Sequence, residues 1–175
     1  MNDEKLLSYH LSLRDPEAGA WNLSPQNLYL EMMSRDFLKR NLELFDGIQI
    51  CNIGIGVGEW DDYLGYISKD FGRVTSVDID QEICSIFEYR QKREGHPNPS
   101  RVVCEDILHT SLQPESFHVV TIIGSTMHEI GNYPDTLEIC FRLLKDNGFL
   151  FYMDLERFNA MDLFNNWVSA AGHSW

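Results

Sequence analysis

Short apolar runs alternate with helix-like segments along most of the chain. The apolar runs are typical of strands buried on both faces of a parallel sheet. The sequence predicts five such strands, over 48–53, 73–77, 101–104, 117–123 and 149–154. The spacing of apolar residues predicts helices over 59–69, 81–94, 134–145 and 157–170. Strands that alternate with helices indicate βαβ units and an α/β fold.

The N-terminal part of the chain lacks this alternation. Residues 1–23 are polar and we expect them to be irregular, whereas Ser24 and Pro25 are a typical start for a long helix that ends near Asp46 and Gly47. The leading segment either completes the core or folds over a ligand as a lid. The lid is favoured because its aromatic side chains need a surface to pack on. The candidates for closing a site are Tyr9, His10, Trp21 and Tyr29.

Three glycines, Gly54, Gly56 and Gly58, alternate between the first strand and the next helix. Glycine permits positive φ and lets the backbone approach a ligand closely. A dinucleotide-binding turn needs its third glycine at position 59, which is Glu59, and the Lys-Ser/Thr of a P-loop is absent. A glutamate at the helix start also disfavours a phosphate there. The pattern favours a nucleoside that carries an amino acid, with a purely structural turn as the alternative.

Acidic residues follow the next two strands. Asp78, at the end of the second strand, can accept hydrogen bonds from both hydroxyls of a ribose, and its alternative role as a helix cap suits Asp80 better. Asp106 follows the third strand and either binds an adenine amino group or is a solvated loop acid. His128 follows the fourth strand. Because the carboxyl ends of parallel strands meet at one edge, we expect these residues to gather there.

The composition narrows the classes of ligand. The 175 residues are enough for one domain with a core, and the net charge of −13 disfavours nucleic acid and suits a neutral or cationic small molecule. The four cysteines, Cys51, Cys84, Cys104 and Cys140, are expected to be core residues in a reducing compartment, not disulfides or metal ligands. Neither a signal peptide nor an apolar run of ~18 residues is present, so we expect a cytoplasmic protein without a membrane partner.

Taken in order, five segments resemble the motifs of class I S-adenosylmethionine (SAM)-dependent methyltransferases: ICNIGIGVGEW, VTSVDIDQEI, CEDI, SFHVVTIIGSTMHEI and RLLKDNGFLFYMD. The resemblance covers residues 48–154. It implies a Rossmann-like three-layer α/β sandwich with a mostly parallel five-stranded sheet in the order 3-2-1-4-5. The family's sixth and seventh strands are expected to be absent, because only residues 155–175 follow. The fifth strand would then be an edge that the C-terminal helix or the second subunit of a homodimer covers.

The same resemblance implies one methyltransferase-like domain over 1–175. Its parts would be an N-terminal lid segment and helix (1–46), a cofactor-binding core (47–154) and a C-terminal helix (155–175). The cofactor would be SAM, with S-adenosylhomocysteine (SAH) as product. The glycines would lie under its methionine part, Asp78 would bind the ribose, and the remaining residues would line the adenine and the sulfonium. The implied cofactor-binding set is Asn52, Gly54, Gly56, Gly58, Asp78, Ile79, Asp106, Ile107, Gly124 and Ser125.

Two positions within the strands depart from the family pattern. Asn52 replaces the usual acidic residue two positions before the first glycine, which weakens the hold on the amino group of the cofactor. His118 stands where an aspartate commonly opens the fourth strand. His128 and Glu129 are the candidate catalytic bases, with packing against the cofactor as the alternative for His128.

The expected activity is methyl transfer to a nitrogen or oxygen of a small metabolite, and the acidic surface favours nitrogen. One alternative is a cofactor-binding subunit that needs a partner, which Asn52 and the short C-terminal part would fit. A protein or RNA methyltransferase is another, although the chain lacks a basic patch for RNA. A nicotinamide dehydrogenase is disfavoured by the glycine spacing.

Overall fold

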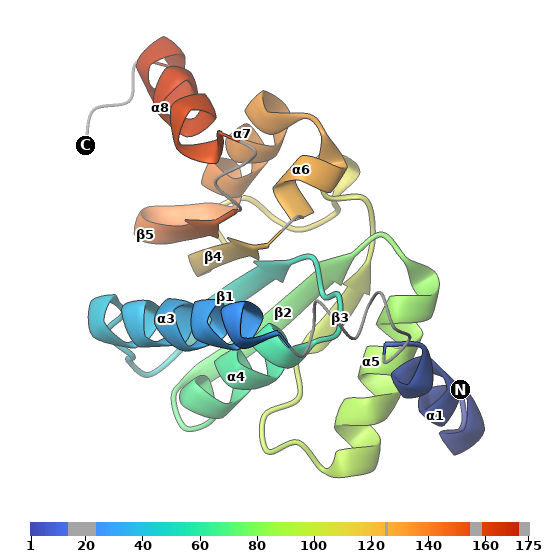
Figure 1. The fold of residues 1–175 in the computed structure, drawn as a ribbon. Helices are drawn as coiled ribbons and strands as arrows, with labels where there is room; N and C mark the ends of the chain where they lie inside the picture. The colour runs from blue at the N-terminus through green and yellow to red at the C-terminus, as the bar shows by residue number, and fades with distance from the viewer. Residues whose placement is uncertain (14–23, 125, 155–158, 172–175) are drawn as a thin grey trace.

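The computed structural model describes residues 1–13, 24–124, 126–154 and 159–171. Within them, five parallel strands form one sheet in the order β3-β2-β1-β4-β5, which confirms the predicted order (Figure 1). The strands are β1 (Ile48–Ile53), β2 (Gly72–Asp78), β3 (Arg101–Cys104), β4 (Phe117–Ile123) and β5 (Leu144–Met153). In the described part of the chain β5 pairs only with β4, so its outer edge carries no further strand.

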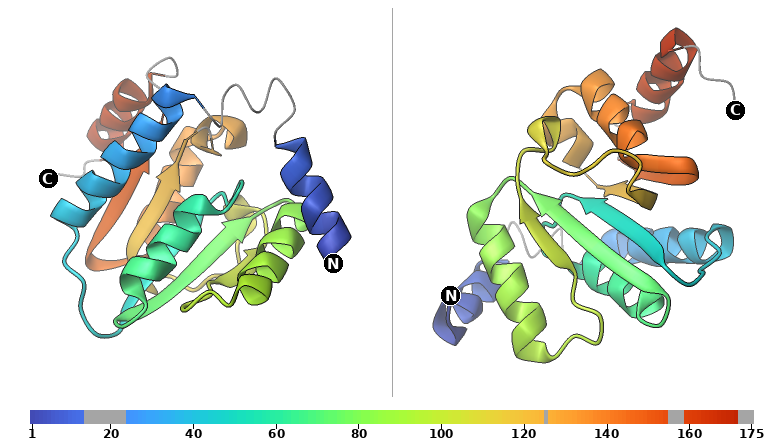
Figure 2. Two further views of the ribbon diagram at one scale, coloured as in Figure 1. Left: turned by 60° about the horizontal axis from the view of Figure 1, so that its bottom comes forward. Right: turned by 180° about the vertical axis from the view of Figure 1, so that it is seen from behind.

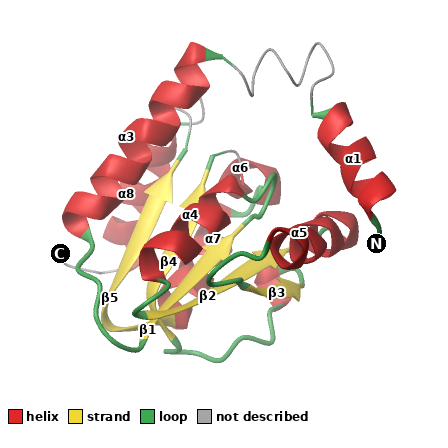
Figure 3. Ribbon diagram, turned by 90° about the horizontal axis from the view of Figure 1, so that it is seen from below, coloured by secondary structure: helices red, strands yellow, loops and turns green. Residues whose placement is uncertain are grey.

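Helices cover both faces of the sheet and complete the three layers (Figures 2 and 3). One face carries α3 (Pro25–Asn41), α4 (Glu59–Ser68) and α5 (Gln81–Glu94). The other carries α7 (Tyr133–Leu143) and α8 (Ala160–Ala171), together with the short α6 (Thr126–Ile130) and η1 (Ile107–His109). No helix among the described residues is both long and apolar enough to span a membrane.

The core explains why the strand sequences are almost continuously apolar. Ile48 and Ile50 of β1 face Leu38 of α3 and Leu64 of α4, in a cluster from which water is excluded. On the opposite face, Cys51 belongs to a second cluster with residues of α7. A large aliphatic side chain stabilises the fold by about 1.5–3 kcal/mol when it is fully buried. β1 therefore contributes to both halves of the core, as the sequence predicts.

Helix α1 (Asp3–Ser12) occupies a segment that the sequence analysis expected to be irregular. The side chain of Asn2 caps this helix by accepting a hydrogen bond of 2.9 Å from Lys5 N. Asp3 and Glu4 stand in the first turn, where negative charge is favourable to the helix dipole. α1 buries none of its residues, so no apolar period reveals it in the sequence. The expectation was wrong because capping, not burial, defines this helix.

Several helix boundaries also differ from the prediction. α3 ends at Asn41 because Leu42 is already extended, well before Asp46. α7 ends at Leu143, and residues 145–148 belong to β5, which therefore begins before the predicted residue 149. There the pairing with β4 shifts register, and Asn147 adopts φ +60°, a conformation that asparagine tolerates. The last helix begins at Ala160, and residues 155–158 lie outside the described part.

Candidate functional site

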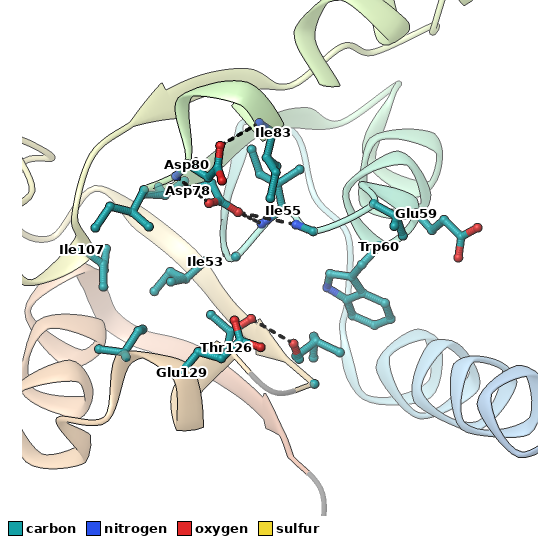
Figure 4. A pocket seen from close by; sticks show the side chains of 18 of the residues that line it. Ile53, Ile55, Glu59, Trp60, Asp78, Asp80, Ile83, Ile107, Thr126 and Glu129 are labelled. Carbon is teal, nitrogen blue, oxygen red and sulfur yellow. Dashed lines mark hydrogen bonds between the residues drawn. The ribbon is translucent and has the colours of Figure 1, made fainter. Parts of the chain in front are cut away.

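A cavity of about 1170 Å³ opens at the carboxyl ends of the strands (Figure 4). Ile53 of β1, Asp78 of β2 and Gly124 after β4 line it, and Met153 of β5 reaches it as well. Residues of α3, α4 and α6 enclose it further. A parallel sheet brings the ends of its strands to one edge, which is why residues far apart in the sequence meet here.

The loop after β1 presents bare backbone to this cavity. Gly54 and Gly56 have φ of +85° and +53°, in the left-handed region that favours glycine. A Cβ at Gly54 would collide with the side chain of Thr126, whereas one at Gly56 would meet no atom within 4 Å. Gly56 therefore offers an open surface where a ligand can approach the main chain. Gly58 has another role, because its Cβ would collide with Phe87 of α5.

The carboxylate of Asp78 is fixed against the same loop. Its Oδ2 accepts a hydrogen bond from Ile55 N at 2.8 Å and a weaker one from Gly56 N at 3.5 Å, and its Oδ1 accepts from Asp80 N at 2.9 Å (Figure 4). A carboxylate has about four lone-pair sites, so acceptor capacity is left for a ligand. Asp80 caps α5 through Ile83 N, the role expected for it, and also lines the cavity.

Three further residues line the side of the cavity that the sequence assigned to adenine. Ile79 is 71% exposed and Ile107 is buried, so together they offer apolar surface. Asp106 lines the cavity and also caps η1, because its side chain accepts a hydrogen bond of 3.0 Å from Leu108 N. A hydrogen bond of 2.9 Å with the ring of His109 lowers the pKa of Asp106. Asp106 thus has a structural role that the sequence analysis did not foresee.

Asn52 does not line the cavity, contrary to its assignment as a cofactor ligand. It is buried behind the glycine loop, where its Nδ2 donates to Gly54 O at 3.1 Å and to Asp61 Oδ1 at 2.9 Å. Its Oδ1 accepts a hydrogen bond of 2.7 Å from the hydroxyl of Thr121. The amide supports the loop from the side away from the cavity.

Asp61, the partner of Asn52, is a buried carboxyl group with 1% exposure. Its Oδ1 also accepts a hydrogen bond of 2.5 Å from the hydroxyl of Ser76, whereas its buried Oδ2 has no hydrogen-bond partner among the described residues. Burial raises the pKa of Asp61 to about 7, and the hydrogen bonds from Ser76 and Asn52 oppose this rise. The carboxylate that the family pattern places at position 52 is therefore replaced by an amide paired with a buried acid.

α1 lies beside the mouth of the cavity. The hydroxyl of Tyr9 donates a hydrogen bond of 3.3 Å to Gly56 O, and His10 lines the cavity. At the other end of α1, Asp3 accepts hydrogen bonds from Tyr89 at 2.6 Å and from Arg93 at 3.0 Å, both on α5. The structure thus brings Tyr9 and His10 to the site.

The other two lid candidates are not brought to the site. Tyr29 is 60% exposed on α3 and does not line the cavity. Trp21 lies outside the described residues.

The side of the cavity between α3 and α4 carries residues that the sequence analysis missed. Glu31 and Glu59 both line it, close enough for Glu59 to affect the pKa of Glu31. Asn27 donates to Glu31 at 3.2 Å, and the guanidinium of Arg35 lies 3.7 Å from the same carboxylate. Burial and the charge of Glu59 raise the pKa of Glu31. Glu59 adjoins the glycine motif, but nothing in the sequence links it to Glu31.

Trp60 forms a rigid aromatic wall of the same cavity. Its ring stacks on Phe151 with centroids 5.6 Å apart and planes 10° from parallel. Its Nε1 donates a hydrogen bond of 3.2 Å to the hydroxyl of Thr121, which in turn donates to Asn52. Trp60 is partly buried against the core and also lines the cavity.

The two candidate bases are placed differently by α6. Glu129 lines the cavity, whereas His128 is exposed and does not line it. Gly124, expected near the sulfonium, lines the cavity, and Ser125 lies outside the described residues. A catalytic or packing role for His128 therefore gains no support from the cavity, and Glu129 is the better placed of the pair.

Comparison with known proteins gives one family and many similar folds. The matching family model is described as a methyltransferase domain and covers residues 51–152. A search of curated proteins finds no match. A SAM-dependent methyltransferase from Aquifex aeolicus is similar with a TM-score of 0.57 and 17% identity, over 83% of this chain and 68% of that one.

Two further solved structures illustrate the range of similarity. The YcgJ protein from Bacillus subtilis has a TM-score of 0.61 and 13% identity, over 82% of this chain and 79% of that one. Phosphoethanolamine N-methyltransferase 1 from Haemonchus contortus, in complex with phosphoethanolamine and SAH, has a TM-score of 0.57 and 18% identity, over 85% of this chain and 31% of that one. Such low identities show a shared fold, and this chain spans only part of each protein's length.

Proposed function

Because the chain belongs to the class I SAM-dependent methyltransferase family, we propose that it transfers the methyl group of SAM to a nitrogen or oxygen of a small metabolite, with nitrogen preferred. The family assignment rests on residues 51–152 and on the sheet order. The family's cofactor is SAM. The acceptor is inferred from the residues that line the cavity.

The cavity fits a nucleoside that carries an amino-acid tail. The bare backbone at Gly56 suits the tail, the fixed carboxylate of Asp78 can accept from ribose hydroxyls, and Ile79 and Ile107 can flank a flat apolar base. When bound, SAM supplies a methyl group on a positively charged sulfur, which is activated for transfer. A cavity of about 1170 Å³ exceeds the ~300–1,000 Å³ common for small-molecule sites, which leaves room for an acceptor.

The preference for nitrogen rests on the proximity of two acids in the cavity, since Glu59 helps to raise the pKa of Glu31 after burial. Two neighbouring carboxylates in a partly buried site are costly to keep ionised together unless a proton or a cation lies near both. An amine or ammonium group can donate hydrogen bonds to both, and the face of Trp60 favours a nearby positive charge. An anionic acceptor would be repelled by the same pair. A cationic or neutral amine therefore suits this side of the cavity best.

In the proposed reaction the lone pair of the acceptor nitrogen must point at the methyl carbon, in line with the bond to sulfur. A protonated amine has no free lone pair, so a nearby carboxylate must accept its proton. Glu31 suits this role because its pKa is raised, and Glu129 can do the same from the other side. Trp60 and the helices around it would orient the acceptor and exclude water.

The test is methyl transfer from labelled SAM to libraries of amines and of hydroxyl compounds. We expect transfer to amines first. Glu59→Gln should raise KM for the amine about tenfold or more, the effect of losing one charged hydrogen bond, while the Kd for SAH stays unchanged. Glu43→Gln, at an exposed position outside the cavity, is the matched control. Absence of label transfer to every compound in both libraries would count against the proposal.

A cofactor-binding subunit that needs a partner is the second candidate, and the amide at Asn52 is the observation that favours it. Calorimetry with SAH separates the two. Binding of SAH without turnover on any acceptor supports the cofactor-binding subunit. If SAH does not bind, both the methyltransferase and the subunit are excluded. A protein or RNA acceptor is the third candidate, and the net charge of −13 is unfavourable to RNA.

We also propose a homodimer formed through the edge of β5. Its support is the unpaired outer edge of β5 in the described part of the chain, where Phe149 is 58% exposed. Such an edge is a template for pairing with another strand. Size-exclusion chromatography with light scattering tests this, and a clean monomer at all concentrations would remove the idea.

A further inference from the structure

One of the four cysteines departs from the expectation that all are core residues. Cys51, Cys84 and Cys140 are buried, but Cys104 is exposed. Cys104 ends β3, where it is the register partner of Asp78 on β2. Cys84 lies in the first turns of α5, directly after the loop that follows β2. Two cysteines from different elements thus meet at this loop.

The two sulfur atoms lie against successive carbonyl groups of the loop. The thiol of Cys84 donates to Asp78 O at 3.5 Å, and the thiol of Cys104 donates to Ile79 O at 3.8 Å. Burial raises the pKa of the Cys84 thiol, and the neighbouring thiol of Cys104 adds to this rise. The same loop carries Asp78 and Ile79 into the SAM cavity, so the thiol pair lies directly behind residues that bind the cofactor.

The pair differs in accessibility, which matters for its chemistry. Cys104 is exposed, whereas Cys84 has only 3% exposure. Neither lines the cavity, so bound SAM would not cover Cys104. An accessible thiol beside a second, resolving thiol is the arrangement found in reversible cysteine oxidation. Cys51 and Cys140 are fully buried and are shielded from oxidants.

We propose that Cys84 and Cys104 form a redox modification site, which a hydroperoxide converts into an intramolecular disulfide that weakens SAM binding. The sulfur of Cys104 attacks one peroxide oxygen, the O–O bond breaks, and a sulfenic acid and one water (or alcohol) result. The sulfur of Cys84 then attacks the sulfenic sulfur, the S–O bond breaks, and a second water leaves. The thiols together lose two electrons and two protons, which reduce the peroxide.

The disulfide acts on the cofactor site through the loop. A disulfide brings the sulfurs to about 2.05 Å, closer than any contact of free thiols, and it removes both S–H donors. The carbonyls of Asp78 and Ile79 lose these partners while α5 is drawn toward β3. The carboxylate of Asp78, which the reduced protein holds against Ile55 N, is displaced with the loop. The site then fits SAM less well.

The experiment treats the reduced full chain with hydrogen peroxide and follows two readouts, peptide mapping by mass spectrometry and calorimetry with SAH. We expect a peptide that links Cys84 to Cys104 and a Kd for SAH raised about fivefold or more, the lower end of typical coupling between sites. A thiol reductant should reverse both. Cys104→Ser should abolish both the linked peptide and the rise in Kd. The control, Cys140→Ser, keeps the pair and should abolish neither. Cys84→Ala provides a second test if Cys104→Ser fails to fold.

Two outcomes would overturn the proposal. One is oxidation of Cys104 to a sulfinic acid or to an intermolecular disulfide without a link to Cys84. The other is formation of the link with an unchanged Kd for SAH. If the reduced protein fails to bind SAH, the cofactor assignment fails separately, because the peptide map reads the thiol pair without any ligand.

Discussion

The buried carboxyl group of Asp61 predicts an unusual dependence of stability on pH. Its pKa is about 7 in the folded protein, against an ordinary value of 3.8. Asp61→Asn removes the ionisable group and keeps an oxygen that can accept from Ser76 and Asn52. A comparison of the two proteins therefore isolates the titration from the hydrogen bonds.

The folded protein binds the proton of Asp61 more tightly than the unfolded chain does. Between pH ~4 and pH ~7 the unfolded chain releases this proton and the folded protein keeps it, so the free energy of unfolding falls as the pH rises. The slope is about 1.4 kcal/mol per pH unit. The total is roughly 4 kcal/mol over the shift from 3.8 to about 7, and it stays constant above that window. Asp61→Asn should lack this loss.

The assay is urea unfolding of both proteins at several pH values from about 5 to about 8. The difference between them cancels the titration of every other group. We expect the stability of Asp61→Asn relative to the wild type to rise by about 3 kcal/mol across this range, because about two pH units of the window lie within it. Any constant offset is due to the unpaired amide of the variant. A difference that does not change with pH would refute the assignment of a raised pKa to Asp61.

Three further predictions concern the same site. Asn52→Asp places a second carboxylate beside Asp61 and should destabilise the fold by on the order of 3 kcal/mol in urea unfolding. Adding Asp61→Asn to the same chain should restore stability. If the effects of the two substitutions simply add, this reasoning is wrong. Asp78→Asn should weaken SAH binding by about 10–100-fold in calorimetry, the loss of a charged acceptor, and unchanged affinity would exclude its ribose role. Tyr9→Phe removes the hydrogen bond to the glycine loop and should weaken SAH binding about 2–10-fold. The control, Tyr29→Phe on the exposed face of α3, should leave SAH binding unchanged. Equal effects of the two substitutions would exclude a lid role for Tyr9.

The sequence predicts those parts of the fold that depend on local pattern. The apolar run of β1 is buried on both faces of the sheet, so its composition alone identifies it. The glycine loop and Asp78 meet because parallel strands end at one edge, which follows from the order of the elements. Capping residues such as Asp80 can also be recognised in the sequence, because a capping side chain bonds to backbone N–H groups only two or three residues away.

The rest depends on partners that are distant in the sequence. Asp61 looks like an ordinary polar helix residue, and only its position beside Asn52 and Ser76 makes it a buried acid. The effect of Glu59 on the pKa of Glu31 likewise depends on how α3 packs against α4. Periodicity reports which face of an element is buried, but it does not report which polar groups meet across elements.

The attachment of α1 bears on two properties that often change together, the residence time of a ligand and the stability of the fold. The helix buries no side chain and is joined to the rest of the described protein by surface contacts of Asp3 and Tyr9. Such exposed contacts contribute little to stability, so their rupture costs far less than unfolding of the sheet. We therefore expect substitutions in α1 to change the residence time of a ligand without lowering the melting temperature.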